Sequence, residues 1–149
     1  MSKKEHTEIL VIGAGPGGYA AAFRAADLGK KVVLVDRDKE LGGVCLNRGC
    51  IPSKALLHIS RVMTEASHLS SIGVSFGQPT IDLSAIRSYK NKIISQLNQG
   101  ISQLAKTRKV KTLTGTATFL SNTEVSIDTG SEKTSLSFNK CIIATGSSS

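Results

Sequence analysis

The first third of the chain carries two short apolar runs joined by glycines and alanines. Residues 9–12 are all apolar and rich in β-branched side chains, and the glycine-rich stretch 13–18 follows at once. An alanine-rich stretch comes next, and Gly29 is suited to end a helix there. A second apolar run from Lys31 to Val35 ends at Asp36. This alternation predicts a strand, a tight turn, a helix and a second, parallel strand.

In the rest of the chain the spacing of apolar residues is first typical of helices and then typical of strands. From Ser53 to Leu69 apolar residues recur every three or four positions, which predicts a helix with one buried stripe. Asp82 is the expected N-cap of another helix that continues to Leu104. From Lys109 to Phe138 the period shifts towards two, which predicts a small antiparallel β-meander. The final run, Cys141 to Ala144, is expected to return to the parallel sheet.

The glycines at 13, 15 and 18 have the spacing of a dinucleotide-binding turn. The first makes the turn, the second lets the backbone approach a pyrophosphate, and the third lets the helix pack closely on the strand. Asp36 lies 23 residues after Gly13, close to the roughly 20 expected for the acid that hydrogen-bonds an adenosine ribose. An unpaired carboxylate there would repel the 2′-phosphate of NADP. The pattern therefore predicts a Rossmann-like α/β fold with a dinucleotide site.

Cys45 and Cys50 form the second chemical feature of the chain. In a regular helix, residues five apart have Cα atoms roughly 8.7 Å apart, whereas a disulfide tolerates about 7 Å at most. A helix that carries both thiols must therefore be distorted. Gly49 relaxes the backbone between them, and Pro52 would clash with the carbonyl of Arg48. We interpret the two thiols as a redox pair that opens and closes a small disulfide ring.

Zinc is the main rival explanation for these cysteines, since His58 and His68 follow them. Zinc sites usually take cysteines two to four apart and histidines three to five apart, whereas four residues separate these cysteines and nine separate these histidines. No metal site is therefore predicted, and both histidines are expected to be structural or to face solvent. Cys141, inside an apolar strand, is expected to be a buried hydrophobe.

Composition agrees with one compact soluble domain. The chain has 149 residues, of which 40% are hydrophobic and 20% charged. Its net charge of +8 is dispersed apart from Lys3-Lys4 and the stretch from Lys106 to Lys111, and only 4% of residues are aromatic, so nucleic acid is not an expected partner. No apolar run approaches a membrane span, and Met1 to Thr7 is polar without a signal-peptide core. We therefore expect a cytoplasmic protein without membrane contact.

The glycine turn, Asp36 and the run GGVCLNRGCIPSK from Gly42 to Lys54 together resemble the N-terminal part of the flavin-dependent pyridine nucleotide-disulfide oxidoreductases. Within that family, CIPSKALL most resembles the dihydrolipoyl (lipoamide) dehydrogenase branch. Glutathione reductases usually have lysine where this chain has Ser53, and mercuric reductases share much of the cysteine run. Family members are longer than this chain. The resemblance implies that residues 1–149 are one FAD-binding domain, the N-terminal fragment of an enzyme whose NAD and dimerisation domains are absent here.

The resemblance also implies roles for individual residues. Cys45 would exchange with the dithiol substrate, while Cys50 would lie as a thiolate against the flavin. Lys54 would lie beside the flavin ring and supply a cation that lowers a cysteine pKa. Gly115 and Ala117 match the segment that holds the adenine. The complete set of residues expected to bind FAD is Gly13, Gly15, Gly17, Gly18, Asp36, Arg37, Gly42, Gly43, Val44, Cys45, Lys54, Gly115, Ala117, Ala144, Thr145 and Gly146.

The activity implied is an electron relay from dihydrolipoamide through the Cys45-Cys50 disulfide and FAD to NAD, with NAD bound by the missing domain. The implied partners are dihydrolipoamide on the carrier domain of a 2-oxoacid dehydrogenase complex and, at full length, a second copy in a homodimer. A mercuric or glutathione reductase-like flavoprotein is an alternative, and so is an FAD-binding module without turnover. All need the same residues, so they stay open at this point. The fragment alone is expected to be inactive.

Overall fold

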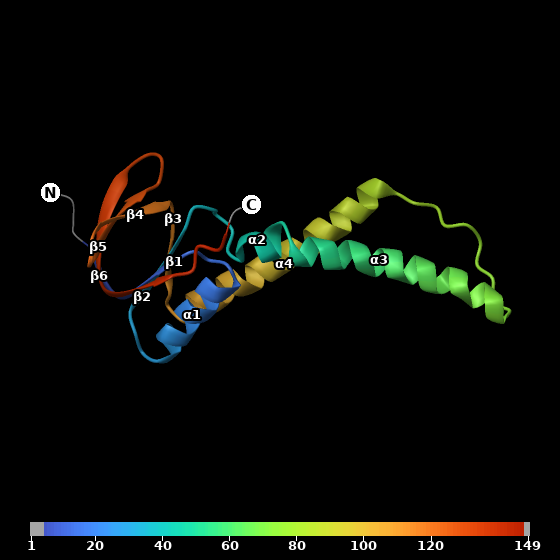
Figure 1. Ribbon diagram of the computed structural model, residues 1–149, viewed down its shortest axis with the longest axis horizontal. Coiled ribbons are helices and arrows are strands. Elements are labelled where there is room, and N and C mark those ends of the chain that lie inside the picture. The colour runs from blue at the N-terminus through green and yellow to red at the C-terminus, as the bar shows by residue number, and fades with distance from the viewer. Residues whose placement is uncertain (1–4, 148–149) are drawn as a thin grey trace.

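One six-stranded sheet lies at one end of this protein, seen in a computed structural model that describes residues 5–147 (Figure 1). Its strands are β1 (Glu5–Ile12), β2 (Val32–Asp36), β3 (Lys111–Thr114), β4 (Thr116–Ser121), β5 (Glu124–Asp128) and β6 (Lys133–Ile143). They lie in the order β3-β2-β1-β6-β5-β4. Lys3-Lys4 of the basic N-terminus and the last two serines lie outside the described residues.

The sheet has a parallel half and an antiparallel half. Strands β3, β2, β1 and β6 are parallel to one another, and β5 pairs antiparallel with both β6 and β4. The predicted α/β class, with a parallel sheet and a small meander, is therefore confirmed. The meander is β4-β5-β6, and the predicted range begins too early because β3 pairs in parallel with β2, with Lys111 opposite Val33. A crossover through the preceding helix returns β3 to the parallel edge.

The end of the sheet also differs from the sequence-based prediction in one respect. The apolar positions around Leu136 and the run from Cys141 belong to a single strand, β6, rather than to two. Residues 133–137 of β6 pair with β5, and the strand then continues beside β1 alone, with Cys141 opposite Leu10. The polar residues Asn139 and Lys140 are exposed at this transition, which interrupts the apolar alternation.

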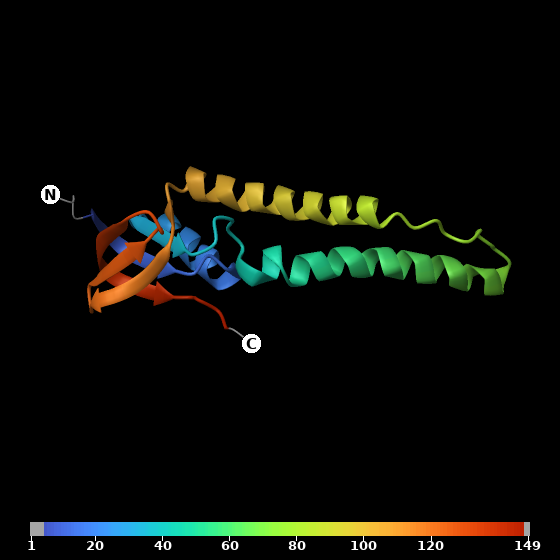
Figure 2. The same cartoon turned by 90° about the horizontal axis from the view of Figure 1, so that it is seen from above.

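The helices divide into those packed on the sheet and those that project from it. They are α1 (Pro16–Asp27), α2 (Gly43–Asn47), α3 (Cys50–His68), the 3-10 helix η1 (Leu69–Ile72) and α4 (Leu83–Thr107). Helices α3 and α4 project together away from the sheet, and a segment around residue 77 joins their far ends (Figure 2). We call residues 50–107 the arm and the remaining described residues the body.

The core lies on both faces of the parallel strands. On the helical face, Val11 and Leu34 pack with Ala22 of α1 and Ala105 of α4. On the other face, Leu10 and Val33 pack with Val125 and Leu136 of the meander. The other buried residues of this second cluster are Ile12, Val35, Ile127 and Phe138. Neighbouring residues of one strand point to opposite faces, so continuous apolar runs are what a sheet covered on both sides requires.

The arm confirms the predicted helices but not the predicted burial. Asp82 caps α4 as expected, since its Oδ1 accepts hydrogen bonds from the amides of Ser84 at 2.8 Å and Ala85 at 3.0 Å. Helix α3 begins at Cys50, three residues before the predicted start. Its apolar stripe is not buried: Ala55 is the one buried residue of α3, while Leu56 is 44% exposed. Helical periodicity identifies an apolar face, but the helix extends beyond the sheet that would cover it.

Candidate functional site

The glycine turn between β1 and α1 has the geometry that its spacing predicts. Gly13 has φ +100°, and a Cβ atom there would lie 2.3 Å from the carbonyl oxygen of Ala144. A Cβ at Gly18 would lie 1.7 Å from the carbonyl oxygen of Gly13, so helix and strand touch at that point. A Cβ at Gly15 would meet no atom within 4 Å. Two glycines are therefore required by packing, while the third faces open space.

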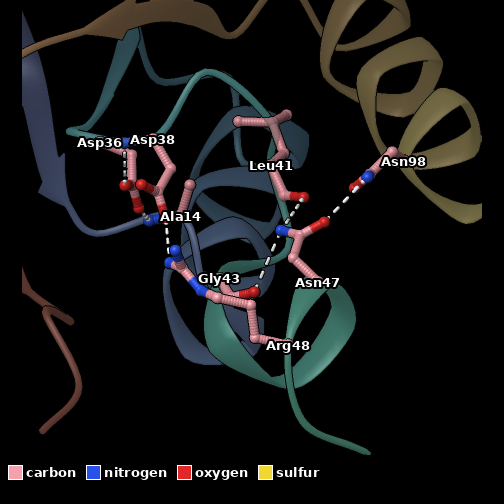
Figure 3. A network of polar contacts seen from close by, with 8 residues as sticks. All are labelled: Ala14, Asp36, Asp38, Leu41, Gly43, Asn47, Arg48 and Asn98. Carbon is pink, nitrogen blue, oxygen red and sulfur yellow. Dashed lines mark hydrogen bonds and ion pairs between the residues drawn. The ribbon is translucent and has the colours of Figure 1, made fainter. Parts of the chain in front are cut away.

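Asp36 ties this turn to the end of β2. Its Oδ2 accepts a hydrogen bond from the Ala14 amide at 2.5 Å, and its Oδ1 accepts one from the Asp38 amide at 2.8 Å (Figure 3). The carboxylate is therefore held by two backbone amides, one in the glycine turn and one just after β2. A carboxylate has about four acceptor sites, so two backbone hydrogen bonds leave capacity for a ligand hydroxyl.

A cleft with two lobes lies where the parallel strands end at their carboxyl side. We call the first the meander lobe, about 350 Å³ in volume, and the second the cysteine lobe, about 490 Å³. Both are lined by Gly13, Asp36, Arg37, Thr145 and Gly146, so they adjoin. The meander lobe adds Ile12, Val35, Gly115, Thr116 and Ala117, and the cysteine lobe adds Gly15, Pro16, Gly17, Asp38, Gly43, Val44, Cys45, Arg48 and Ala144; Ser147 lines both.

Most of the residues expected to bind a cofactor line this cleft. The exceptions are Gly18, which packs against the turn, Gly42, Cys50 at the start of α3, and Lys54 four residues further along α3. The cleft is also lined by residues that the sequence patterns did not identify, namely Pro16, Asp38, Arg48, Thr116 and Ser147. Thr116 could have been found, since it stands between two selected residues; nothing in the sequence pairs Arg48 with Asp38.

Two glycines in the left-handed region bring α2 onto the glycine turn. Gly42 has φ +108° and Gly43 has φ +60°. A Cβ at Gly42 would come within 2.3 Å of the Leu46 side chain, and one at Gly43 would lie 2.7 Å from the Cα of Gly15. The Gly42 amide also donates to the carbonyl of Ala14 at 2.8 Å. The segment that carries Cys45 is therefore fastened directly to the predicted phosphate turn.

The predicted distortion between the two cysteines is a complete break in the helix. Helix α2 ends at Asn47 and α3 begins at Cys50, with Gly49 between them at φ −124° and ψ −100°. Pro52 falls in the first turn of α3, where its missing N–H costs no helical hydrogen bond. Both thiols are free; Cys45 is half-buried and Cys50 is exposed.

The neighbouring Cys50 influences the pKa of the Cys45 thiol. A hydrogen bond with Cys50 is the largest cause that raises the pKa of the Cys45 thiol, followed by desolvation. The positive charge of Lys54 lowers the same pKa but has the smallest effect. At Cys45 the expected lowering of the pKa by Lys54 is therefore outweighed in the dithiol state. Cys141 is half-buried rather than fully buried, and burial raises the pKa of its thiol.

Polar side chains support the segment around Cys45 from two sides (Figure 3). On one side, Arg48 forms an ion pair with Asp38, at the rim of the cysteine lobe. On the other side, the Asn47 amide group donates to the carbonyls of Gly43 at 3.0 Å and Leu41 at 3.3 Å. The next link leaves the body: Nδ2 of Asn98 on α4 donates to Oδ1 of Asn47 at 2.9 Å.

His58 and His68 both lie exposed on α3, which agrees with the expectation that they are structural or face solvent. Within residues 5–147, no group of three or more His, Cys, Asp or Glu side chains is placed to hold a metal ion. In the same range, no helix combines the length and apolar character needed to span a membrane.

Comparisons with known proteins agree on one family. The family model described as pyridine nucleotide-disulphide oxidoreductase matches residues 7–149. A protein of Haemophilus influenzae named dihydrolipoyl dehydrogenase is 49% identical over 148 residues, and one of Buchnera aphidicola with the same name is 48% identical over 147 residues. Each match covers 99% of this chain and 31% of the relative. A Staphylococcus aureus protein of the same name is 43% identical over 141 residues, 95% of this chain and 30% of its own length. The chain thus spans about a third of these relatives.

Proposed function

The chain belongs to the pyridine nucleotide-disulphide oxidoreductase family, and we propose that it is the FAD-binding domain of a dihydrolipoyl dehydrogenase. The domain assignment covers residues 1–149, with NAD and dimerisation domains in the part of the enzyme that this chain does not include. The coverage of the relatives supports it, since the matched region is 31% of their length. Relatives at 43–49% identity are also named dihydrolipoyl dehydrogenase.

The continuity of the cleft carries this proposal. Its lining runs from Ala117 in the meander lobe past Gly13 to Cys45 in the cysteine lobe. An elongated dinucleotide fits this shape, with adenine at the meander lobe, pyrophosphate at the glycine turn and flavin towards the thiols. The open space beside Gly15 and Gly17 supports the fit, because a Cβ there would meet nothing within 4 Å. The N–H groups that begin α1 would then point at the phosphates.

The two cysteines would carry the exchange with substrate. As the dithiol of dihydrolipoamide is oxidised to its cyclic disulfide, the Cys45-Cys50 disulfide is reduced to two thiols, with two electrons and two protons transferred. Cys45 would form the mixed disulfide, and Cys50 would face the flavin. Bound FAD would supply two-electron chemistry between this pair and NAD. The helix break lets both thiols face one another without the spacing that a regular helix imposes.

The remaining cofactor residues would hold and orient FAD. Asp36 would bind the ribose with its free acceptor capacity, and Arg37 would lie at the junction of the lobes. Gly42, Gly43 and Val44 would shape the segment beside the pyrophosphate. Lys54 would lie at the flavin edge. Gly115 would hold the adenine through its main chain; a Cβ there would lie 2.8 Å from the carbonyl oxygen of Asp128. Residues 144–146 would close the cleft.

The partners follow from the same assignment. The substrate is dihydrolipoamide on the carrier domain of a 2-oxoacid dehydrogenase complex, the electron acceptor is NAD, and the full-length enzyme is a homodimer in the cytoplasm. Among alternative reductases of the family, a glutathione reductase is disfavoured by Ser53. For the chain alone we expect no NAD reduction at an enzyme-like rate, because general acid–base catalysis contributes about 10²–10⁴-fold and orientation more.

The test combines cofactor binding with thiol chemistry. The purified chain is titrated with FAD and with NAD, and we expect tighter binding of FAD together with a change in the flavin spectrum. Air oxidation followed by alkylation and mass spectrometry should recover Cys45 linked to Cys50, with Cys141 free. A Cys141→Ser variant should behave like the wild type, while Cys50→Ser should lose the disulfide. Equal binding of NAD, or three equally reactive thiols, would refute the proposal.

A further inference from the structure

Helix α4 buries an amide where an apolar side chain would be expected. Of its 25 residues, the two that are buried are Asn98 and Ala105. Asn98 is 6% exposed, and within residues 5–147 the other buried polar side chain is Thr7. Burying an amide is unfavourable unless its hydrogen bonds are replaced. The position of Asn98 therefore needs a specific partner.

That partner is Asn47, the last residue of α2. Asn98 donates to Oδ1 of Asn47 at 2.9 Å, and Asn47 donates onward to the carbonyl of Gly43 at 3.0 Å, the first residue of α2 (Figure 3). Oδ1 of Asn98 is buried and accepts no hydrogen bond from the residues that the structure describes. The hydrogen bond to Asn47 therefore compensates part of the cost of burying Asn98.

This amide chain contacts the helix that carries one thiol. Cys45 lies in the five-residue helix α2, between Gly43 and Asn47, and both ends of that helix are held by the Asn47 side chain. Cys50 begins α3 on the other side of the helix break. A helix this short has little stability of its own. Its position relative to Cys50 therefore depends on what fastens it from outside. The Gly42 amide ties its start to the glycine turn, and Asn98 supplies a second contact from α4.

We propose that Asn98 and Asn47 are positioning residues that hold Cys45 within bonding range of Cys50 and thereby set the reduction potential of the pair. This inference rests on the proposed redox role of the two cysteines. Forming the disulfide removes two electrons and two protons from the thiols and requires their Cα atoms within about 7 Å. A fastened α2 raises the effective concentration of one thiol at the other, which stabilises the disulfide. Without the fastening, the disulfide becomes easier to reduce.

The experiment measures the thiol equilibrium directly, without flavin. The 149-residue chain is equilibrated with mixtures of glutathione and glutathione disulfide, which is reduced to two glutathione molecules as the Cys45-Cys50 disulfide forms. Alkylation and mass spectrometry then give the oxidised fraction. We expect Asn98→Leu, which has similar volume but no amide, to weaken disulfide formation by about three- to tenfold; tenfold corresponds to about 30 mV towards a less negative potential.

The matched control is Asn91→Leu, an identical exchange at an exposed position of the same helix; it should change the equilibrium less than about twofold. In a double-mutant cycle, Asn98→Leu added to Asn47→Leu should give little further shift. If Asn98→Leu changes the circular dichroism spectrum, Asn98→Ala takes its place.

Equal potentials for the Asn98 and Asn91 variants would overturn the inference and leave the proposed function standing. A wild-type chain that forms no Cys45-Cys50 disulfide at any glutathione ratio would overturn both. A stability change in Asn98→Leu without a change in potential would also contradict the positioning role, since it would leave a structural role alone.

Discussion

The body and the arm are built from similar apolar patterns but bury them differently. In the body, Leu10, Val11 and Val35 are each 0% exposed. In the arm, α3 buries Ala55 and α4 buries Asn98 and Ala105, whereas Leu57 is 66% exposed and Leu83 is 63% exposed. The body therefore obtains its structure from contacts between distant segments. The arm depends more on helix propensity, caps and neighbours within each helix.

The redox pair lies at the boundary between these two regions. Cys45 belongs to the body through α2, and Cys50 is the first residue of the arm. The hydrogen bond between Asn98 and Asn47 crosses this boundary. The ion pair of Arg48 with Asp38 lies beside it, within the body. The geometry of the thiols thus depends on how firmly the loosely packed region is attached to the tightly packed one.

The largest effect is expected inside the body, at the glycine turn. We predict that Gly18→Ala costs about 3 kcal/mol or more, because its Cβ would lie 1.7 Å from the Gly13 carbonyl oxygen and no side-chain movement relieves that overlap. The matched control is Gly17→Ala on the same helix, where a Cβ meets nothing within 4 Å and removing glycine stabilises the helix by about 1 kcal/mol. Urea unfolding gives both values; equal effects would contradict the packing argument.

A pair of leucine truncations tests the comparison between body and arm. Leu34 is 1% exposed in β2, so we predict that Leu34→Ala lowers the free energy of unfolding by about 2–5 kcal/mol. Leu57 is 66% exposed on α3, and Leu57→Ala should change it by less than about 0.5 kcal/mol. Thermal or urea unfolding followed by circular dichroism measures the two differences. A loss at Leu57 as large as that at Leu34 would show that the arm is covered in solution.

These contrasts show what the sequence could predict. The fingerprint of Gly13, Gly15 and Gly18 predicted the turn because its requirements are local: a positive φ, a close approach and a smooth helix face. The cap at Asp82 was predictable for the same reason. The exposure of α3 was not, because periodicity reveals an apolar face and says nothing about whether another element covers it.

In the candidate site, too, local features were predictable from the sequence and contacts between distant residues were not. The distortion between Cys45 and Cys50 was predicted from helix geometry and two known helix breakers, and it is confirmed, in the form of a complete break. The contact between Asn47 and Asn98 joins residues 51 positions apart, and no local pattern signals such a pair. Sequence patterns also missed that β3 joins the parallel edge, since the direction of pairing depends on the crossover through α4.

A smaller effect is expected at the start of α4. Removing the Asp82 cap leaves the amides of Ser84 and Ala85 without their acceptor, so Asp82→Ala should cost about 1 kcal/mol. Hydrogen exchange at the first turn of α4 should accelerate accordingly. Ser84→Ala is the control, because it keeps the Asp82 carboxylate. If the arm opens independently of the body, exchange in α4 will change while exchange in β1 stays constant; coupled changes in both would show one cooperative unit.

The smallest effect concerns the thiol at the boundary and its dependence on pH. The pKa of Cys45 lies above its ordinary value of 9.0, chiefly because of the hydrogen bond with Cys50, so less thiolate is present near neutral pH. A raised pKa in the folded state means that the associated stability is complete below pH 9 and is lost as the pH rises through the folded value.

Cys50→Ala removes the largest cause of the raised pKa, so the pKa of Cys45 should fall and its alkylation by iodoacetamide at pH 7.5 should accelerate. Lys54→Met removes a positive charge that lowers this pKa and should slow the reaction, while Cys141→Ala should leave it unchanged. Rates of Cys45 modification measured by mass spectrometry between pH 6 and 10 give the sign of each shift, and slower alkylation in Cys50→Ala would show that the two thiols do not interact as the structure indicates.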